Sequence, residues 1–343
     1  MSITLRNVAK EAGISVSTAS RVINNDKYTS EDVKKKVLEA IEKINYRPNL
    51  IARGLKKSRT RTLGFIIPEI LNPFAVSIIN TMEHYSYEKG YSSVLCITEN
   101  DLGKEKNYIN TLKGKQIDGY IIIPHSSIND HYGEMFEGEN VVSIDINMSI
   151  ADEFCVKLNN FLGIKLAMDY LLSLGHRKIG IINMPIELQT GHERFEAFKK
   201  ICNDKKINLN DQFIKFTEME KNPIPGIKMI ESAKEKTLEL MTQKEKPTAI
   251  ISTGIYVSIG ILRGFIKLGT LIPKDISFIS FDELYEYSDL FKTGITTIKQ
   301  PAKEIGEFAI ELLLKKIEGK NLEPGIFEME PQLIIRDSCK RIN

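Results

Sequence analysis

The chain has 343 residues, of which 42% are hydrophobic and 27% charged, and its mean hydropathy is −0.17, so a disordered or low-complexity protein is excluded. The formal net charge is only +2, but residues 1–61 hold 14 Lys/Arg against 6 Asp/Glu, a local charge of +8, which leaves −6 for residues 62–343. A basic amino-terminal module on a mildly acidic body indicates a polyanionic partner such as nucleic acid.

The sequence also excludes several other classes of protein. No apolar run approaches the roughly 18 residues of a membrane span, and the first residues lack the apolar stretch of a signal peptide, so we expect a cytoplasmic protein without membrane contact. The cysteines stand far apart with no CxxC pair, which predicts neither a metal site nor a disulfide framework: Cys96, Cys155, Cys202 and Cys339. No cofactor motif is present, and the length predicts two or three domains.

The first sixty residues predict three helices. Thr4 caps the first, whose apolar positions Leu5, Val8 and Ala9 recur at helical spacing, and Gly13 turns the chain. Either Ser15 or Ser17 caps the second helix, which ends at Asn24 and Asn25. Its apolar face is expected to consist of Val16, Ala19, Val22 and Ile23. Two short helices around a glycine turn predict a helix-turn-helix, whose second helix enters the major groove of DNA.

A third helix completes the predicted headpiece. Thr29 and Asp32 have capping-box spacing, and the helix after them carries exposed lysines. Its buried stripe is expected to hold Val33, Val37, Leu38, Ile41 and Ile44. The alternative is a plain helical bundle with a solvated lysine face. Short hydroxyl side chains and one arginine on an exposed helix favour DNA binding, since such groups reach phosphates and base edges.

The segments TLRNVAKEAGISVSTASRVIN (4–24) and YRPNLIARGL (46–55) resemble the headpiece and hinge of the LacI/GalR family of bacterial transcription regulators. Shorter echoes of the family follow in order almost to the carboxyl terminus: residues 71–74, 117–119, 175–177, 272–277, 280–282, 296–301 and 333–338. The resemblance therefore covers nearly the whole chain.

The resemblance implies which residues contact DNA. Val16 and Ser17 match the positions that most influence operator choice, and Arg21 is suited to a forked contact with guanine. Asn24 and Asn49 match phosphate contacts. The full implied set of DNA-binding residues is Thr4, Ser15, Val16, Ser17, Thr18, Ser20, Arg21, Asn24, Asn49, Ala52 and Leu55.

Residues 47–61 are expected to form a hinge helix and a linker. Pro48 suits a helix start, but a helix of about ten residues that contains Gly54 does not offset its nucleation cost alone. In the family, two such helices pair in the minor groove, and Leu55 matches the leucine that wedges into the central base step. Folding of the hinge would then depend on DNA. The alternative is a plain basic linker over residues 56–61.

From residue 62 onward, short apolar runs alternate with helical stretches, which predicts parallel sheets with helices on both faces. Two such series predict two α/β lobes, the fold of periplasmic binding proteins in the family. The expected strands are 63–67, 93–97, 120–123 and 141–144, then 179–182, 213–216, 249–252 and 276–279, and helices are expected near 74–88, 104–115 and 302–317. Ligands of such sheets bind at the carboxyl ends of the strands, so we expect a cleft between the lobes.

The domain boundaries follow from the resemblance and not from composition. We expect a headpiece at 1–46, the hinge and linker at 47–61, and a core for effector binding and dimerisation at 62–343. Lobe 1 would span about 62–159 and 293–322, and lobe 2 about 162–289 and 327–343, with the helix 302–317 crossing back to lobe 1.

The family's effector cleft maps onto Phe74, His125, Asp145, Thr190, Arg194 and Asp282. Phe74 offers an apolar ring face, the two aspartates accept from hydroxyls, and Arg194 makes a forked contact to oxygen. Two alternatives stay open: Asp282 as a helix cap and Arg194 as a surface ion-pair partner.

Two departures from the family pattern put a standard neutral-sugar site in doubt. Gly254 and Ile255 stand where many sugar-responsive relatives carry an Asn-Asp pair, and Asn159-Asn160 replaces an expected Asp-Asn. Arg194 with His125 would suit a sugar acid or sugar phosphate, and a protein co-regulator is a further alternative. The predicted effector is therefore a sugar, a sugar acid or a sugar phosphate.

Two rival functions and the oligomeric state complete the expectations. No GxG, GxxxxGK[ST], GxSxG or HExxH occurs, so we expect no enzyme activity and no cofactor, and His176 reads as a loop or cap residue. A stand-alone sugar-binding module of a transporter is opposed by the headpiece. One headpiece reads half a site, so a homodimer on near-palindromic double-stranded operator DNA is expected. Only five residues follow Ser338, too few for tetramer-forming leucine heptads. The sequence thus predicts a DNA-binding repressor controlled by a small effector.

Overall fold

The computed structural model describes residues 3–23, 29–46, 59–125, 131–218, 226–284 and 293–342. The chain divides into two compact units, residues 1–61 and 62–343. The hinge positions Asn49, Ala52 and Leu55, and Asn24 at the end of the second helix, lie outside the described residues.

The amino-terminal unit contains three helices, α1 (Leu5–Glu11), α2 (Val16–Ile23) and α3 (Glu31–Lys43). Their shared core is small and aliphatic, formed by Val8, Val22, Val37 and Ala40. The turn between α1 and α2 passes through Gly13, whose φ of +66° belongs to the left-handed region that a side chain disfavours. The two helices and their tight turn form the predicted helix-turn-helix.

The capping residues predicted from the sequence are found at two of the three helix starts. Asn7 Oδ1 accepts hydrogen bonds from the amide (2.9 Å) and hydroxyl (2.7 Å) of Thr4, and Ser15 Oγ accepts from the amide of Thr18 at 3.1 Å. The third expectation was wrong, because α3 begins after Ser30 and not after Thr29.

Two apolar headpiece residues are exposed where burial was expected. Leu38 on α3 is 57% exposed, and its place in the core is taken by Ala40, one helical turn after Val37. Val16 at the start of α2 is 41% exposed and does not pack with Ala19 and Val22.

Lobe 1 of the second unit is built on a six-stranded, wholly parallel sheet in the order β11-β5-β4-β3-β1-β2. The strands are β1 (Thr62–Ile67), β2 (Ser92–Ile97), β3 (Gly119–Ile122), β4 (Val141–Ile144), β5 (Phe154–Leu158) and β11 (Gly325–Met329). Successive residues of β3 bury their side chains on opposite faces: Ile121 packs in one core and Ile122 in the other. Both faces are therefore covered, as the continuous apolar strands predicted.

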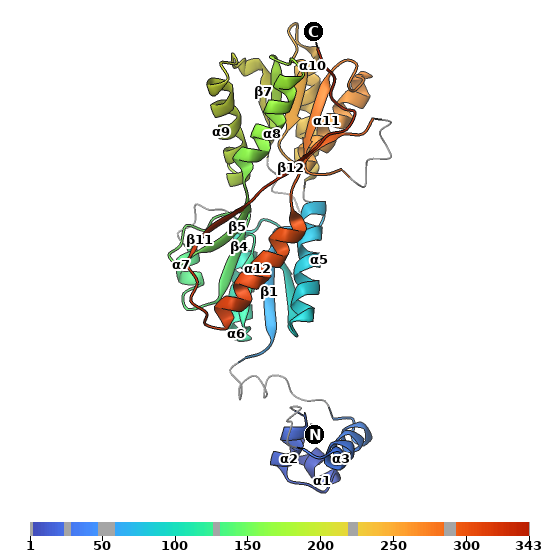
Figure 1. Ribbon diagram of the computed structural model, residues 1–343, viewed down its shortest axis with the longest axis vertical. Helices are drawn as coiled ribbons and strands as arrows, with labels where there is room; N and C mark the ends of the chain where they lie inside the picture. The colour runs from blue at the N-terminus through green and yellow to red at the C-terminus, as the bar shows by residue number, and fades with distance from the viewer. Residues whose placement is uncertain are drawn as a thin grey trace. The chain divides into compact units, whose positions relative to one another are not determined.

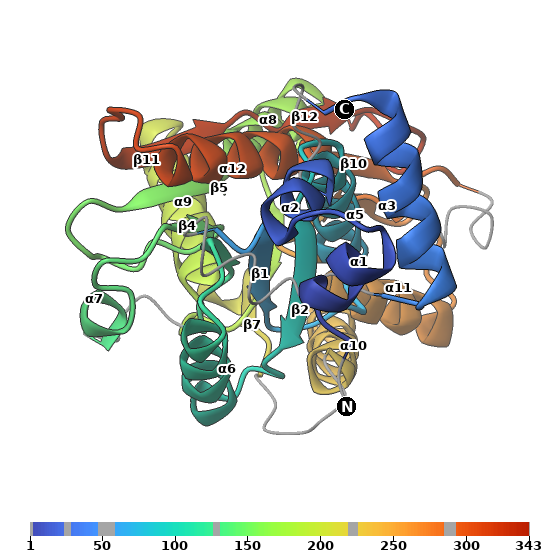
Figure 2. The ribbon, with the colours of Figure 1, turned by 90° about the horizontal axis from the view of Figure 1, so that it is seen from below.

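Four helices cover this sheet: α5 (Pro73–Glu88), α6 (Leu102–Gly114), α7 (His131–Met135) and α12 (Ala302–Ile317). Ile78 of α5 and Ile310 of α12 pack in one core, whereas Ile109 of α6 and Tyr132 of α7 pack in the other. Figure 2 shows α12 and α6 on opposite sides of the sheet.

Lobe 2 has a six-stranded sheet in the order β12-β10-β9-β8-β6-β7. The strands are β6 (Ile179–Asn183), β7 (Ile214–Phe216), β8 (Ala249–Ser252), β9 (Ser277–Phe281), β10 (Thr296–Lys299) and β12 (Gln332–Ile334), and a short 3-10 turn, Asp211–Phe213, precedes β7. Five strands are parallel, but β12 runs antiparallel to β10. This edge strand departs from the predicted all-parallel arrangement.

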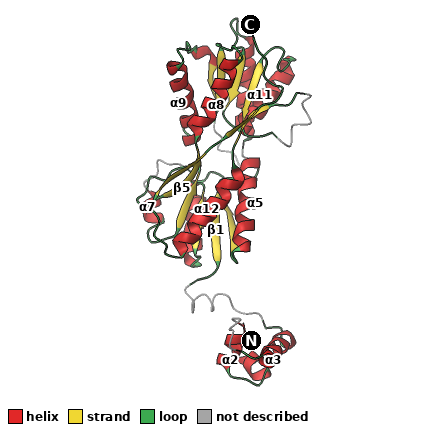
Figure 3. Ribbon diagram, viewed as in Figure 1, coloured by secondary structure: helices red, strands yellow, loops and turns green. Residues whose placement is uncertain are grey.

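The helices of lobe 2 are α8 (Asn160–Ser173), α9 (Gln189–Asp204), α10 (Ile227–Thr242) and α11 (Ile255–Leu268). Ile164 of α8 and Phe198 of α9 share one core, and Ala233 of α10 and Ile261 of α11 share the other. The sheet lies between the two helix pairs (Figures 1 and 3).

The chain crosses between the lobes three times. The first crossing is at Asn159, between β5 and α8, near the expected position. The other two fall at 300–301 and 330–331, because β10 belongs to the second sheet and β11 to the first. The boundaries expected near 289–293 and 322–327 were therefore placed too early.

Candidate functional site

The predicted DNA-contact residues within the described part of the headpiece gather on α2 and its start. Val16, Ser17 and Arg21 are exposed, and the Oγ of Ser15 lies 2.7 Å from that of Ser17 and 2.8 Å from Thr18 Oγ1. Thr18 and Ser20 are half-buried, and Thr4 caps α1. This places a methyl-bearing side chain, hydroxyls and a guanidinium on one short exposed helix, as base and phosphate recognition requires.

The core contains a cavity of about 200 Å³ between the lobes. All six residues predicted for the effector cleft line it: Phe74, His125, Asp145, Thr190, Arg194 and Asp282. They come from strand ends and helix starts of both sheets, the edge where doubly wound sheets hold ligands. Asn72 caps α5 through its Oδ1, which accepts from the amide of Phe74 at 3.0 Å, and Pro73 opens the helix.

Asp145 and Asp282 occupy equivalent places in the two lobes. Each follows the third strand of its six-stranded sheet, β4 or β9, and each has a left-handed backbone, with φ of 67° and 72°. The amide of Asp145 donates to the carbonyl of Val156 and that of Asp282 to the carbonyl of Ile298, both at 3.0 Å. Each lobe therefore ends a strand with a sharp turn that delivers one carboxylate to the cleft. No helix starts directly after Asp282, but its carboxylate accepts a hydrogen bond from the backbone of Ile255, the first residue of α11, so Asp282 caps a helix that is distant in sequence.

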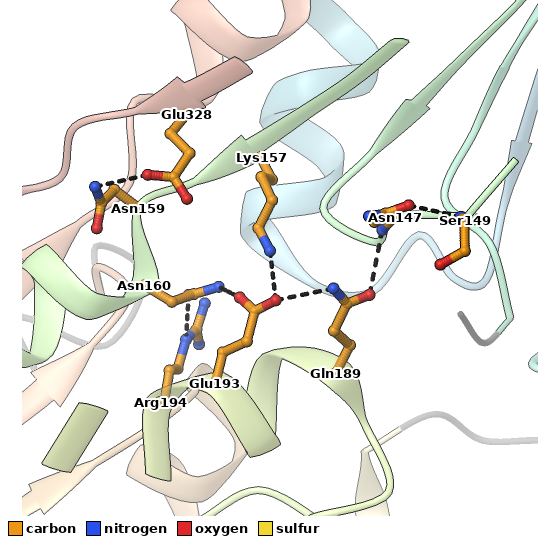
Figure 4. Close-up of polar contacts among 9 residues, drawn as sticks. All are labelled: Asn147, Ser149, Lys157, Asn159, Asn160, Gln189, Glu193, Arg194 and Glu328. Atoms are coloured by element: carbon orange, nitrogen blue, oxygen red, sulfur yellow. Dashed lines mark hydrogen bonds and ion pairs between the residues drawn. The ribbon is translucent and has the colours of Figure 1, made fainter. Parts of the chain in front are cut away.

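Arg194 on α9 is the central cation of the cleft and is only 3% exposed, which rules out a surface ion pair. Its Nε donates to Asn160 Oδ1 at 2.8 Å (Figure 4). Its Nη1 donates to the carbonyl of Thr253 at 2.6 Å. The guanidinium carbon lies 3.7 Å from the ring centroid of Phe281, a stacking contact. Position, orientation and charge of this side chain are thus determined by the protein.

The two aspartates and Arg194 influence each other electrostatically. Burial raises the pKa of Asp145 and Asp282, and the nearby Arg194 opposes that change. Burial likewise lowers the pKa of Arg194, and the nearby Asp282, Asp145 and Glu193 oppose that change. Three carboxyl groups of the protein therefore act on this cation.

Gln300 was not predicted as a cleft residue from the sequence, although it lies in the segment 296–301 that resembles the family. Its Nε2 donates to Asp282 Oδ1, it is 8% exposed and it lines the cavity. Among the residues that the structure describes, none bonds its Oε1. A buried acceptor without a partner costs free energy, so this oxygen is ready for a donor from a ligand.

His125 is held at the cavity by a buried carboxylate that was not predicted. Its amide donates to Glu105 Oε2 and contacts the hydroxyl of Tyr132, both at 3.0 Å, and that hydroxyl donates to Glu105 Oε1 at 2.6 Å. Burial raises the pKa of Glu105. Glu105 therefore determines where the loop of His125 enters the cleft.

A side-chain hydrogen bond also joins the two lobes across the cleft. Tyr256, on the first turn of α11 in lobe 2, donates to Glu69 Oε2 of lobe 1 at 2.7 Å. Burial raises the pKa of Glu69. Both residues line the cavity, and neither was singled out in the sequence.

The remaining lining of the cavity is largely apolar. Met184, Leu188, Met229 and Ile255 from lobe 2 line it, together with residues 123 and 146 from lobe 1. At Gly254 a Cβ would lie 2.6 Å from the sulfur of Met184, so the glycine allows this methionine to pack against the chain. The missing Asn-Asp pair is thus replaced by apolar surface.

Other features of the described residues are structural. No group of three or more His, Cys, Asp or Glu side chains in this part of the chain is placed to hold a metal ion, and none of its helices is long and apolar enough to cross a membrane. The four cysteines are free. His176 is a fully buried loop residue whose ring nitrogens contact Thr248 Oγ1 and the carbonyl of Lys340.

Comparison with known proteins covers both units. Residues 4–49 match the sequence family described as bacterial regulatory proteins of the lacI family, and residues 168–339 match a periplasmic binding protein-like domain. The chain is 32% identical over 342 residues to the HTH-type transcriptional repressor PurR of Photobacterium profundum, covering 99% of each chain, and 31% identical to PurR of Vibrio vulnificus. The chain belongs to the LacI family of bacterial regulatory proteins.

Solved structures with the same fold carry DNA or sugars. The Lac repressor dimer bound to operator and an anti-inducer matches 99% of this chain with a TM-score of 0.86 at 21% identity. A periplasmic binding protein/LacI regulator from Alkaliphilus metalliredigens complexed with D-xylulofuranose matches 81% with a TM-score of 0.68 at 27% identity. As a LacI-family member, the protein is a DNA-binding transcriptional regulator with an effector-binding core, and the predicted fold class is confirmed.

Proposed function

We propose that this protein is a cytoplasmic, non-enzymatic transcriptional repressor that binds a near-palindromic operator as a homodimer and is controlled by a small ligand in the cleft. The observation that carries the control step is the set of half-buried Asp145 with buried Arg194, Asp282 and Gln300, which joins both lobes around one cavity. A ligand that contacts carboxylates from both lobes favours their closed arrangement, and closure is a difference that DNA binding can sense.

The charges of the cleft favour a neutral, donor-rich ligand over an anion. Arg194 directs two of its N–H groups to Asn160 and Thr253 and lies near the carboxyl groups of Asp282 and Asp145, so part of its charge is already compensated. Two cavity-lining atoms have no partner among the described residues: Gln300 Oε1, which is an acceptor, and His125 Nδ1, which donates or accepts according to the ring tautomer. Of the three ligand classes that the sequence left open, a neutral sugar or sugar-like molecule therefore fits best.

The apolar lining adds a second requirement. The side chains of Met184, Leu188, Met229 and Ile255 offer no hydrogen bonds to hydroxyls, and Gly254 and Ile255 stand where many sugar-responsive relatives carry Asn and Asp. A ligand with a hydroxyl-rich head and an apolar or flat body satisfies both parts of the cavity. We propose an amphipathic effector of this kind.

A thermal-shift panel tests the ligand proposal. Matched probes are D-galactose, phenyl β-D-galactopyranoside and D-galacturonate, with D-ribose, adenosine and ribose 5-phosphate as a second set. The neutral sugars with a flat substituent should raise the melting temperature most and the anions least, and any stabilising ligand should change operator affinity by linkage. Stabilisation by the anions alone would exclude the neutral-ligand proposal.

The DNA-binding proposal has a test of its own. An operator selected in vitro from random duplexes should be near-palindromic, and the logarithm of its affinity should fall steeply and linearly with the logarithm of salt concentration. A flat salt response would contradict phosphate binding by the basic headpiece.

A further inference from the structure

The side chain of Asn160 connects the ligand-facing arginine with a neighbouring carboxylate. Its Oδ1 accepts from Arg194 Nε at 2.8 Å, and its Nδ2 donates to Glu193 Oε2 at 2.7 Å (Figure 4). Asn160 is 3% exposed, so neither bond is exchanged for one to bulk water. Because the carboxylate only accepts, it holds the NH2 group of Asn160 and keeps the amide oxygen turned towards the guanidinium. Glu193 thus orients the group that orients Arg194.

Glu193 is in turn held from the other lobe. Lys157 on β5 of lobe 1 forms an ion pair with Glu193 Oε1 on α9 of lobe 2, and the lysine side chain is 7% exposed. Gln189, one turn earlier on α9, donates to the same oxygen at 2.8 Å, and its Oε1 accepts from the amide of Asn147 in lobe 1 at 3.2 Å. Figure 4 shows these side chains converging on Glu193. Two groups of lobe 1 therefore reach a single face of α9.

The electrostatics of Glu193 agree with a carboxylate held by this network. Burial alone would raise its pKa, but the hydrogen bonds from Lys157 and Asn160 outweigh burial and lower it. Breaking this partly buried ion pair leaves the charge of Lys157, whose side chain is buried, without compensation, which costs free energy. Moving the lobes apart would separate Lys157 from Glu193 and so break the same ion pair.

From this chain of contacts we infer that Glu193 is a positioning residue for Arg194 and that Lys157 makes the placement of Arg194 depend on the closeness of the lobes. With the lobes close, Lys157 holds Glu193, Glu193 holds Asn160, and Asn160 holds the guanidinium. With the lobes apart, the first contact is lost and the guanidinium is less constrained. By reciprocity, a ligand that favours the held arginine favours close lobes. This inference rests on the proposed function, because it concerns the same cleft.

The test follows the Nε–H proton of Arg194 in the full-length protein, without ligand or DNA. Nuclear magnetic resonance of 15N-arginine-labelled protein reports its exchange with water, and loss of the signal in Arg194→Lys assigns it. Lys157→Met and Glu193→Gln should each speed this exchange by about tenfold, as expected when a charge-assisted hydrogen bond is weakened. Glu196→Gln is the matched control on α9, since Glu196 pairs with exposed Lys199 of its own helix, and it should leave the exchange unchanged.

The double variant separates a relay from two independent effects. If Lys157 acts through Glu193, the exchange rate in Lys157→Met/Glu193→Gln should equal that of Glu193→Gln alone. Exchange unchanged in Lys157→Met, or rates that multiply in the double variant, would overturn the inference. Should Lys157→Met fail to fold, Lys157→Gln and Gln189→Ala interrupt the same contacts and serve in its place. Because no ligand or operator is present, failure here leaves the proposed repressor function to its own tests.

Discussion

Replacement of Arg194 by lysine tests whether the geometry of the guanidinium, and not only its charge, holds the cleft together. The charge facing Asp145 and Asp282 is kept, but an ammonium group does not reproduce the planar fork to Asn160 and Thr253. One lost charge-assisted hydrogen bond costs about 2 kcal/mol. Loss of stacking on Phe281 costs about 1 kcal/mol more.

The expected destabilisation of about 3 kcal/mol corresponds to a fall in the melting temperature of the core by about 6 °C, at roughly 2 °C per kcal/mol for a domain of this size. Urea unfolding and calorimetry of the wild-type and variant proteins measure it. Arg263→Lys is the matched control, because Arg263 lies on α11 with a 55% exposed side chain and pairs with Glu231 at 3.2 Å, and it should change stability by less than about 0.5 kcal/mol. Equal effects of the two substitutions would refute the reasoning.

Three further predictions concern the headpiece, the hinge and pH. Arg21→Ala should weaken operator binding by about 1–3 kcal/mol and relax the base preference at one position. Lys35, an exposed lysine of α3, is expected to meet phosphate only, so Lys35→Ala should weaken binding to all sequences alike. Binding to a set of single-base operator variants distinguishes the two outcomes. Leu55→Ala should weaken binding to operator DNA much more than binding to non-specific DNA, as measured by gel shift. Equal loss on both DNAs would reject insertion of Leu55 into the central base step. Burial lowers the pKa of His176 below its ordinary value of 6.5, so the unfolded chain binds its proton first. Stability should therefore fall as pH drops below about 6.5, and His176→Gln should reduce this fall in urea titrations at pH 7.5 and 5.5.

The headpiece illustrates what local pattern predicts well. Thr4, Ser15 and Gly13 act within a few residues of themselves, so capping and turn chemistry located the helices of the helix-turn-helix correctly. Exposure was predicted less well. Leu38 and Ala40 both fit the predicted apolar stripe of the helix. The core of three short helices is small, and the packing of the helices buries Ala40 and leaves Leu38 exposed.

Some strands of the core were predicted from the sequence and others were not. The early strands, such as β1 and β4, are largely apolar because both faces are buried, and they were predicted from that pattern. The four strands that the sequence reading missed, β5, β10, β11 and β12, are the ones near the crossings between lobes. β11 and β12 alternate or mix exposed and half-buried residues at a sheet edge, which gives a weak periodic signal.

The cleft shows the same limit at the level of single residues. Its six predicted positions line one cavity, but their roles remain proposals, and they were located through resemblance and not through spacing. Gln300, Glu105 and Glu69 were missed because their partners, Asp282, Tyr132 and Tyr256, lie 18, 27 and 187 positions away in the chain.

By itself, the sequence determined the charge division between a basic headpiece and an acidic body, the helix-turn-helix, the alternation of strands and helices, and the family. These properties depend on composition or on neighbours within one or two turns of chain. The tertiary structure alone decided that Arg194 is buried close to carboxyl groups of both lobes, that part of the cleft wall is apolar, and that Lys157 reaches Glu193 across the lobes. Such long-range contacts form only when two sheets and their connections are in place, so no local pattern records them.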